Sequence, residues 1–264
     1  MMSNPINAAV ELRGVTVRFG DFTAVQEVHL KVDEGEFLAI VGPTGCGKST
    51  LLNVVAGLLT PSAGEIQVFG QQARGIVRSA GYLFQQDALL PWKTALNNVA
   101  LGLVFRRFPA EEARRQARSW LAKVGLEGFE NHYPHELSGG MRKRVGLAQI
   151  LILSPKILLM DEPFSDLDVH TRNLMENELL RLWHEDKKSV LFVTHDLEEA
   201  VALADRVIVF AAGPASRPIG ELAIPLSRPR DVAEIRLTER FLKIHRELWN
   251  ILRAEVFKRY AQQA

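Results

Sequence analysis

The sequence predicts an α/β fold, because short apolar runs typical of fully buried parallel strands alternate along the chain with segments of helical periodicity. Four such runs lie at Phe37–Val41, Ile157–Met160, Val190–Thr194 and Val207–Ala211, and each is rich in branched residues. The first run enters a glycine-rich turn that leads into a helical segment over Lys48–Leu59. Strand, loop and helix in this order are the start of a βαβ unit.

Two regions depart from this alternation. Near the N-terminus, Val10–Phe19 and Val28–Val32 alternate apolar and polar residues, which predicts half-exposed antiparallel strands. Residues 87–153 instead have helical character, with helices predicted over Pro109–Val124 and about Met141–Leu153. We therefore expect an N-terminal antiparallel β subdomain and a helical subdomain inserted between two halves of the α/β sheet.

A last helix, from about Val232 to Tyr260, is predicted by apolar residues at three- and four-residue steps. These residues are Ile235, Phe241, Ile244, Leu248, Ile251, Leu252 and Val256. We expect residues 1–230 to form the main domain and residues 231–264 to form a C-terminal helical extension. Packing on its own core is the simplest role for this helix, with contact to a second copy or regulation as alternatives.

The composition is ordinary for a soluble globular protein of 264 residues, with 47% hydrophobic and 24% charged residues. The formal charge of +1 gives no bulk attraction to nucleic acid or to anionic membranes. A single cysteine, Cys46, excludes an internal disulfide and fits a reducing compartment. No run reaches the roughly 20 apolar residues that span a bilayer, and Met1–Ala9 lacks the pattern of a secretion signal. We expect a cytosolic protein unless a partner holds it at a membrane.

The glycine-rich turn matches the phosphate-loop pattern G-x-x-x-x-G-K-S/T. Glycines let the backbone N–H groups face a phosphate chain, and the following helix N-terminus adds positive potential. Lys48 can reach the terminal phosphates and the Ser49 hydroxyl can ligate Mg²⁺. With a strand before it and a helix after it, this loop predicts a P-loop NTPase with a RecA-like core. The nucleotide-binding residues are Gly42, Pro43, Thr44, Gly45, Cys46, Gly47, Lys48, Ser49 and Thr50, with Cys46 filling a loop position.

A second predicted strand, Ile157–Met160, ends in the carboxylates Asp161 and Glu162. Neighbouring side chains on an extended segment point apart, so one acid can face a magnesium ion and the other an attacking water. Asp161 suits the metal, and Glu162 suits the role of general base in phosphoryl transfer. Solvated acids at a strand exit are the alternative, which the phosphate loop disfavours.

The segment Leu137–Met141 reads Leu-Ser-Gly-Gly-Met and precedes a predicted helix. Ser138 and the N–H groups of Gly139 and Gly140 therefore form a second anion site at a helix N-terminus. One chain rarely needs two γ-phosphate sites, so the economical explanation is that this site serves a nucleotide held by another copy. With this segment, the sequence resembles the ATPases of ATP-binding cassette (ABC) transporters.

The resemblance extends over nearly the whole chain and rests on six motifs in the family's order. They are Walker A (Gly42–Thr50), the Q-loop glutamine Gln85, the signature (Leu137–Met141), Walker B (Ile157–Glu162), the D-loop (Ser165–Asp168) and the switch histidine His195.

The resemblance implies ATP and Mg²⁺ as ligands, with Ser49, Gln85 and Asp161 at the metal. It implies that Lys48, Gln85, Glu162 and His195 serve catalysis, His195 by holding the γ-phosphate and orienting Glu162. It further implies that Phe19 stacks on adenine and that Asp168 works across a dimer interface. Phe19 stands where tyrosine is frequent, Met141 where glutamine is frequent, and Asp166 where a small residue is usual, which adds charge near the dimer seam.

Within the family, Leu89–Trp92 and Asn97–Val99 resemble the nitrate/sulfonate/taurine importer ATPases, as do Asp161–Asp168, His195–Asp205 and Ser227–Asp231. This implies a head-to-tail homodimer that couples ATP hydrolysis to uptake of a small anion such as nitrate, sulfonate or taurine. It implies docking on two transmembrane permease subunits near Leu89, Leu90 and Trp92, and an external solute-binding protein as an indirect partner. The chain would then lie peripherally on the cytoplasmic face of the inner (plasma) membrane.

Two other functions compete with this interpretation. A soluble ABC ATPase that acts on nucleic acid or ribosomes usually carries two cassettes or a long coiled-coil insertion, whereas this chain has one compact cassette and near-neutral charge. A small-molecule kinase would leave Leu137–Gly140 without a function. We therefore expect no nucleic-acid partner.

The apolar segment that contains Leu90 and Trp92 is expected to belong to a docking groove for a short permease helix, with core packing of these two residues as the alternative.

Overall fold

The computed structural model describes residues 8–263, without the side chains of Val256 and of residues 258–263. Two predictions lie outside the described part: the absence of a secretion signal in the segment that starts at Met1, and a core position for Val256.

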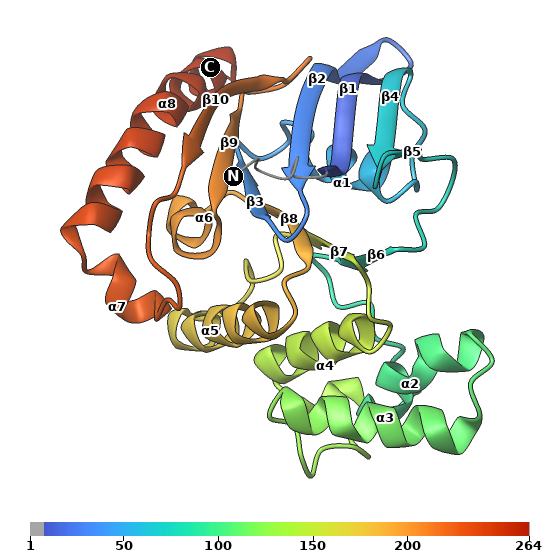
Figure 1. Cartoon of the computed structure of the whole chain (residues 1–264). Helices are drawn as coiled ribbons and strands as arrows, with labels where there is room; N and C mark the ends of the chain where they lie inside the picture. The colour runs from blue at the N-terminus through green and yellow to red at the C-terminus, as the bar shows by residue number, and fades with distance from the viewer. Residues whose placement is uncertain (1–7, 264) are drawn as a thin grey trace, which may run out of the picture.

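The α/β prediction is confirmed by a six-stranded sheet in the order β10-β9-β3-β8-β7-β6 (Figure 1). Its strands are β3 (Phe37–Val41), β6 (Ala80–Leu83), β7 (Ile157–Asp161), β8 (Ser189–Thr194), β9 (Arg206–Phe210) and β10 (Pro218–Ala223). All neighbouring pairs are parallel except β9 and β10. Every residue of β3, β7 and β8 is buried, which explains why these strands read as continuous apolar runs.

An antiparallel sheet in the order β2-β1-β4-β5 forms the second layer, as the alternating N-terminal pattern predicts. It consists of β1 (Ala8–Phe19), β2 (Phe22–Asp33), β4 (Ala63–Val68) and β5 (Gln71–Gln72). Helix α1 (Lys48–Val55) contributes Leu51, Leu52, Val54 and Val55 to one apolar core shared with both sheets. The start of α1 is thereby fixed between two layers, which gives the loop before it a rigid support.

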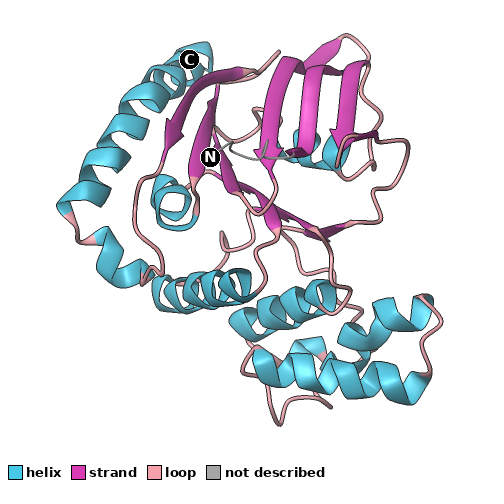
Figure 2. Ribbon diagram, viewed as in Figure 1, coloured by secondary structure: helices cyan, strands magenta, loops and turns pink. Residues whose placement is uncertain are grey.

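A helical layer extends from the edge of the core at β6 and β7 (Figure 2). It contains α2 (Ala95–Phe105), α3 (Ala110–Lys123), the 3-10 turn η1 (Pro134–Glu136) and α4 (Gly139–Leu151). Its buried side chains, among them Val99, Leu121 and Val145, belong to the same apolar core as α5 (Val169–Glu185) and α6 (Leu197–Leu203). Helix α4 is therefore packed against the part of the core that carries β7 and α5.

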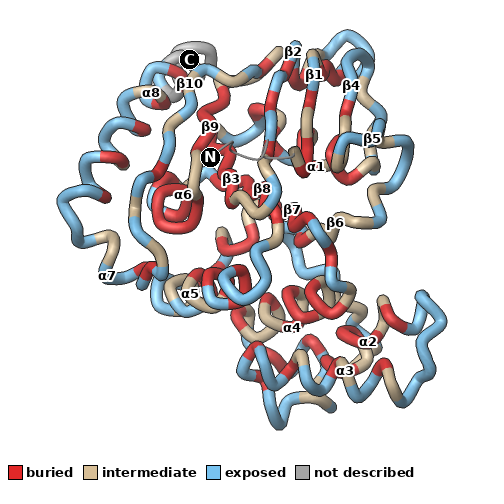
Figure 3. Tube along the Cα trace, in the orientation of Figure 1, coloured by how far each residue is buried: buried red, intermediate tan, exposed pale blue. Residues whose placement is uncertain are grey.

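The predicted last helix is two helices, α7 (Val232–Arg236) and α8 (Glu239–Gln263). The break falls at Leu237 and Thr238, where the Thr238 hydroxyl accepts a hydrogen bond from the N–H of Phe241 and starts the new helix. The apolar spacing continues across the break, so the pattern alone does not reveal it. Phe241, Ile244, Leu248 and Leu252 are buried against the core, and α8 covers β9 and β10 (Figures 1 and 3).

Candidate nucleotide-binding and catalytic site

The glycine-rich loop between β3 and α1 brings a buried lysine to the carboxyl end of the sheet. Gly47 adopts φ +91°, and a Cβ there would lie 2.6 Å from Cγ1 of Val25, so this position requires glycine. Lys48 is 4% exposed, and its Nζ donates to the carbonyls of Gly42 at 2.9 Å and Pro43 at 3.3 Å. The ammonium group lies within the curve of the loop, where it can neutralise a bound phosphate chain.

Cys46 has the packing role that the sequence predicts. Its side chain is 1% exposed, and burial raises the pKa of its thiol. A buried protonated thiol is a poor nucleophile, so Cys46 fills space under the loop.

Oxygen donors gather where α1 meets the end of β7. The Ser49 hydroxyl donates to Oδ1 of Asp161 at 2.8 Å, and the Tyr82 hydroxyl donates to Oδ2 of the same carboxylate at 3.3 Å. Burial raises the pKa of Asp161, against the lowering effect of these two hydrogen bonds. Gln85 follows β6, which pairs with β7, so its backbone lies at the same edge of the sheet; the residue is exposed, and its carbonyl accepts a hydrogen bond from Nζ of Lys143. A hydroxyl, a carboxylate and an amide oxygen suit Mg²⁺, so the residues present fit that ion.

Glu162 is held in an uncommon backbone conformation directly after β7. Its φ is +43°, its N–H donates to the carbonyl of Val193 at 2.9 Å, and its carbonyl accepts from the Ser165 hydroxyl at 3.0 Å. A non-glycine residue at positive φ is strained, and such strain is concentrated at functional sites. The bend separates the side chain of Glu162 from the oxygen cluster at Asp161.

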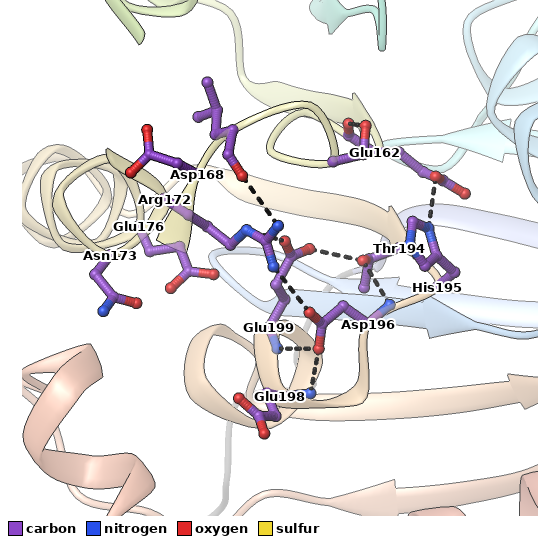
Figure 4. A network of polar contacts seen from close by, with 12 residues as sticks. Glu162, Asp168, Arg172, Asn173, Glu176, Thr194, His195, Asp196, Glu198 and Glu199 are labelled. Carbon is purple, nitrogen blue, oxygen red and sulfur yellow. Dashed lines mark hydrogen bonds and ion pairs between the residues drawn. The ribbon is translucent and has the colours of Figure 1, made fainter. Parts of the chain in front are cut away.

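The carboxylate of Glu162 lies between two nitrogen groups. Its Oε2 is 2.7 Å from Nδ1 of His195 (Figure 4), and its Oε1 is 3.8 Å from Nζ of Lys48. His195 follows β8, the neighbour of β7, so parallel strand order brings together two residues that are 33 positions apart. The three side chains thus face one space above the glycine-rich loop, where a terminal phosphate and a water molecule could meet.

The start of α4 is packed against the start of α5. The Ser138 hydroxyl accepts from the N–H of Met141 at 3.3 Å and caps α4. A Cβ on Gly140 would lie 2.5 Å from Cγ2 of Thr171, so only glycine permits this approach. Asp168 caps α5 by accepting from the N–H groups of His170 and Thr171, and hydrogen bonding to Thr171 lowers the pKa of this exposed carboxylate.

Comparison with known proteins identifies the family to which the chain belongs. The family model described as ABC transporter matches residues 25–165. An uncharacterized ABC transporter ATP-binding protein of Methanocaldococcus jannaschii is 46% identical over 236 residues, which are 89% of this chain and 86% of that protein. The taurine import ATP-binding protein TauB of Yersinia pestis is 42% identical over 205 residues, which are 78% of this chain and 80% of that protein.

Among solved structures, the chain resembles the dimeric post-hydrolysis state of the ATP-binding cassette MJ0796 bound to ADP and Pi. The TM-score is 0.73 at 35% identity, over 83% of this chain and 100% of that chain. This chain belongs to the ABC transporter family. It is an ATP-binding cassette whose ATPase activity is coupled to transport. Within residues 8–263, no helix has the length and apolar character needed to cross a membrane.

Two aromatic side chains stand at the turn between β1 and β2 of the cassette. Phe19, which the sequence singles out, is 51% exposed, and its register partner Phe22 is 52% exposed. The same hairpin reaches the glycine-rich loop through Val25, which lies against Gly47. Phe22 was missed by the sequence analysis, although a second aromatic residue across a two-residue Gly-Asp turn is a visible signal.

A groove of about 350 Å³ opens beside the Q-loop of the cassette. Phe84, Leu89, Leu101 and Phe105 are among its lining residues, which come from the edge of the sheet, α2 and α4. Trp92 lies outside this groove and is 70% exposed, whereas Leu90 is partly buried and joined to Asn98 through its backbone. Core packing of Trp92, one of the two alternatives for this segment, is therefore wrong.

Proposed function

We propose that this chain is the ATP-hydrolysing subunit of an importer, which couples Mg-ATP binding and hydrolysis in a head-to-tail homodimer to uptake of a small anion such as nitrate, sulfonate or taurine. The taurine import ATP-binding proteins among its relatives and the dimeric cassette among its structural neighbours support this proposal. The subunit would be held on the cytoplasmic face of the membrane by two permease subunits, and an external binding protein would deliver the solute.

The observation that carries the proposal is the placement of Glu162 between Lys48 and His195. A carboxylate in this position can accept a proton from water while that water attacks the γ-phosphorus of ATP. The bond between the γ-phosphorus and the bridging oxygen then breaks, and ADP leaves with inorganic phosphate. Lys48 and the loop N–H groups would stabilise the negative charge on the phosphates, and His195 would keep Glu162 oriented.

Around this centre, the remaining residues have supporting roles in our proposal. Ser49, Asp161 and Gln85 would hold Mg²⁺, which supplies charge neutralisation on the β- and γ-phosphate oxygens when bound. Phe19 would stack on adenine, since an exposed aromatic face is suited to a base. Ser138, Gly139, Gly140 and Asp168 would complete the site of the partner copy.

Docking on a permease distinguishes this function from that of a soluble ABC ATPase. The apolar groove beside Gln85 can receive a short helix, and exposed Trp92, three residues after the lining residue Leu89, is available as an aromatic anchor. Loss of the γ-phosphate near Gln85 would shift the helical layer and thereby move the permease.

The variant Trp92→Ala tests this docking role. We expect intrinsic ATPase activity of the isolated chain to stay within about twofold of the parent, because Trp92 is exposed and is not among the residues that contact Glu162. Assembly with a permease that the parent chain is shown to bind, and uptake of labelled nitrate or taurine in proteoliposomes, should fall by about tenfold or more. Trp249→Ala, which removes an exposed tryptophan from α8, is the matched control and should transport normally.

The docking role is wrong if Trp92→Ala assembles and transports like the parent. Stimulation of the ATPase by ribosomes or RNA, with no stimulation by any permease, would instead support the soluble ATPase.

A further inference from the structure

An arginine near the start of α5 joins the D-loop to the segment that carries the switch histidine (Figure 4). Nη2 of Arg172 donates to the carbonyl of Leu167 at 3.1 Å, and Nη1 donates to Oδ2 of Asp196 at 3.2 Å. Leu167 directly precedes Asp168, and Asp196 directly follows His195. One guanidinium group therefore ties together two loops that bear proposed site residues.

A second arginine repeats this bridge from the C-terminal extension. Nη2 of Arg236, at the end of α7, donates to both carboxyl oxygens of Glu176 at 3.2 and 3.0 Å, and Nη1 donates to Oδ1 of Asn173. Its Nε is 3.6 Å from Oε2 of Glu198. Asn173 and Glu176 lie on α5, whereas Glu198 lies on α6, so α7 connects the same two helices that Arg172 connects.

The contact of Arg236 with Glu176 is shielded from water, whereas the side chain of Glu198 is 55% exposed. The side chain of Glu176 is 0% exposed and that of Arg236 is 15% exposed. Charge-assisted hydrogen bonds from one guanidinium nitrogen to both oxygens of a buried carboxyl group restrict the orientation of the pair as well as its distance. Because water does not reach Glu176, loss of Arg236 would leave this carboxyl group without a replacement partner and would remove the contacts that join α7 to α5 and α6.

The bridge continues to the residues beside His195 through a buried hydrogen-bonded chain. The Thr194 hydroxyl donates to Oε2 of Glu199 at 2.6 Å and accepts from the N–H of Asp196 at 3.0 Å. Nε of Arg172 is 3.7 Å from Oε1 of Glu199. His195 lies between Thr194 and Asp196, which both belong to these hydrogen-bonded contacts, and it contacts Glu162 directly. Displacement of α6 would therefore move the His195 side chain.

We propose that Arg236 is a positioning residue for ATP hydrolysis, which holds α5 and α6 in register from the C-terminal extension and thereby fixes Asp168 and His195. Asp168 and Asp196 are the N-caps of α5 and α6, so a rotation of either helix is transmitted to its loop. The extension then has a function in catalysis in addition to its packing on β9 and β10.

The variant Arg236→Met tests this role, because methionine retains apolar length and removes every hydrogen bond of the guanidinium group. We expect kcat for ATP to fall about tenfold, since small misplacement of catalytic groups is costly. The Kd for ATP should stay within about twofold, because no contact of Arg236 reaches the glycine-rich loop in the described residues. Arg246→Met, at an exposed position of α8, is the matched control and should keep the parental kcat.

A double variant separates positioning from simple stabilisation. Arg236→Met alone leaves Glu176 buried without its partner, so its Tm should fall. At pH 9, above the raised pKa of Glu176, Arg236→Met with Glu176→Gln no longer buries a carboxylate and should recover most of the Tm, but the link between α7, α5 and α6 stays broken and kcat should stay low.

Recovery of both Tm and kcat in the double variant would show that the pair only stabilises the fold and would overturn the proposal. An unchanged kcat in Arg236→Met would do the same. If neither variant folds, the pair is a requirement of folding and the positioning role is likewise overturned.

Discussion

Glycine is the N-cap of α1 and the first residue of α4, and both helices offer an N-terminus to an anion, but their surroundings differ. The start of α1 faces a catalytic arrangement within its own chain, formed by Lys48, Asp161, Glu162 and His195. The start of α4 has exposed Ser138 as its cap and Thr171 of α5 beside Gly140. In our proposal, the α1 site therefore draws most of its residues from a single chain, whereas the α4 site would contact a nucleotide held by a second copy.

The largest effect should come from removing the cation that distinguishes the α1 site. Lys48→Ala deletes the ammonium group that faces the phosphates, so we expect hydrolysis to fall by about 10³-fold and ATP affinity to fall with it. The fold should survive, because among the described residues the side chain of Lys48 bonds only carbonyls of its own loop and lies near Glu162. ATPase assays together with a thermal melt check both expectations, and a folded Lys48→Ala chain with parental turnover would contradict the assignment.

A somewhat smaller effect is expected for the base of the α1 site. Glu162→Gln keeps the shape and the contact with His195 but cannot accept a proton, so turnover should fall by about 10²-fold or more while ATP still binds. This variant should accumulate as an ATP-bound dimer in size-exclusion chromatography. The parent dimer should instead dissociate after it hydrolyses ATP. Near-normal turnover would remove Glu162 from the role of general base.

The smallest effect concerns α5, the helix against which the α4 site is packed. Burial raises the pKa of Glu176 to about 8, above its value in an unfolded chain, so the folded chain retains this proton while the unfolded chain loses it. This contribution to stability is fully present below the unfolded pKa of 4.5 and is lost as pH rises through the folded pKa. Glu176→Gln does not titrate, so its Tm relative to the parent should rise by about 2 °C or more between pH 5 and pH 8. A Tm difference that is independent of pH would contradict the raised pKa.

Much of the fold follows from the sequence because the strands at Phe37, Ile157, Val190 and Val207 are continuous apolar runs. Strand β6 was not predicted, since Ala-Gly-Tyr-Leu at a sheet edge is short and only weakly apolar. Helix α5 was also not predicted, because its buried face includes a charged residue, Glu176. The break between α7 and α8 was not predicted, because it is set by the hydroxyl of Thr238 and the spacing of apolar residues carries no information about this cap.

The candidate site was predictable in its members but not in its contacts. The glycine-rich loop and the Asp161–Glu162 pair have local patterns that carry their chemistry. The approach of His195 to Glu162 depends on β8 lying beside β7, which only the topology decides. Tyr82 and Arg172 were missed because neither belongs to a motif, and their partners are 79 and 24 residues away along the chain.

Mixing two inactive variants tests most directly whether the α4 site serves the nucleotide of a second chain. Lys48→Ala damages the α1 site and Ser138→Arg blocks the α4 site, so each variant alone should be nearly inactive. A hybrid dimer would have one composite site damaged twice and one intact. We predict that activity returns in the mixture in proportion to the hybrid fraction, measured with differently tagged chains. No recovery in a mixture shown to contain hybrids would contradict a site shared between two chains.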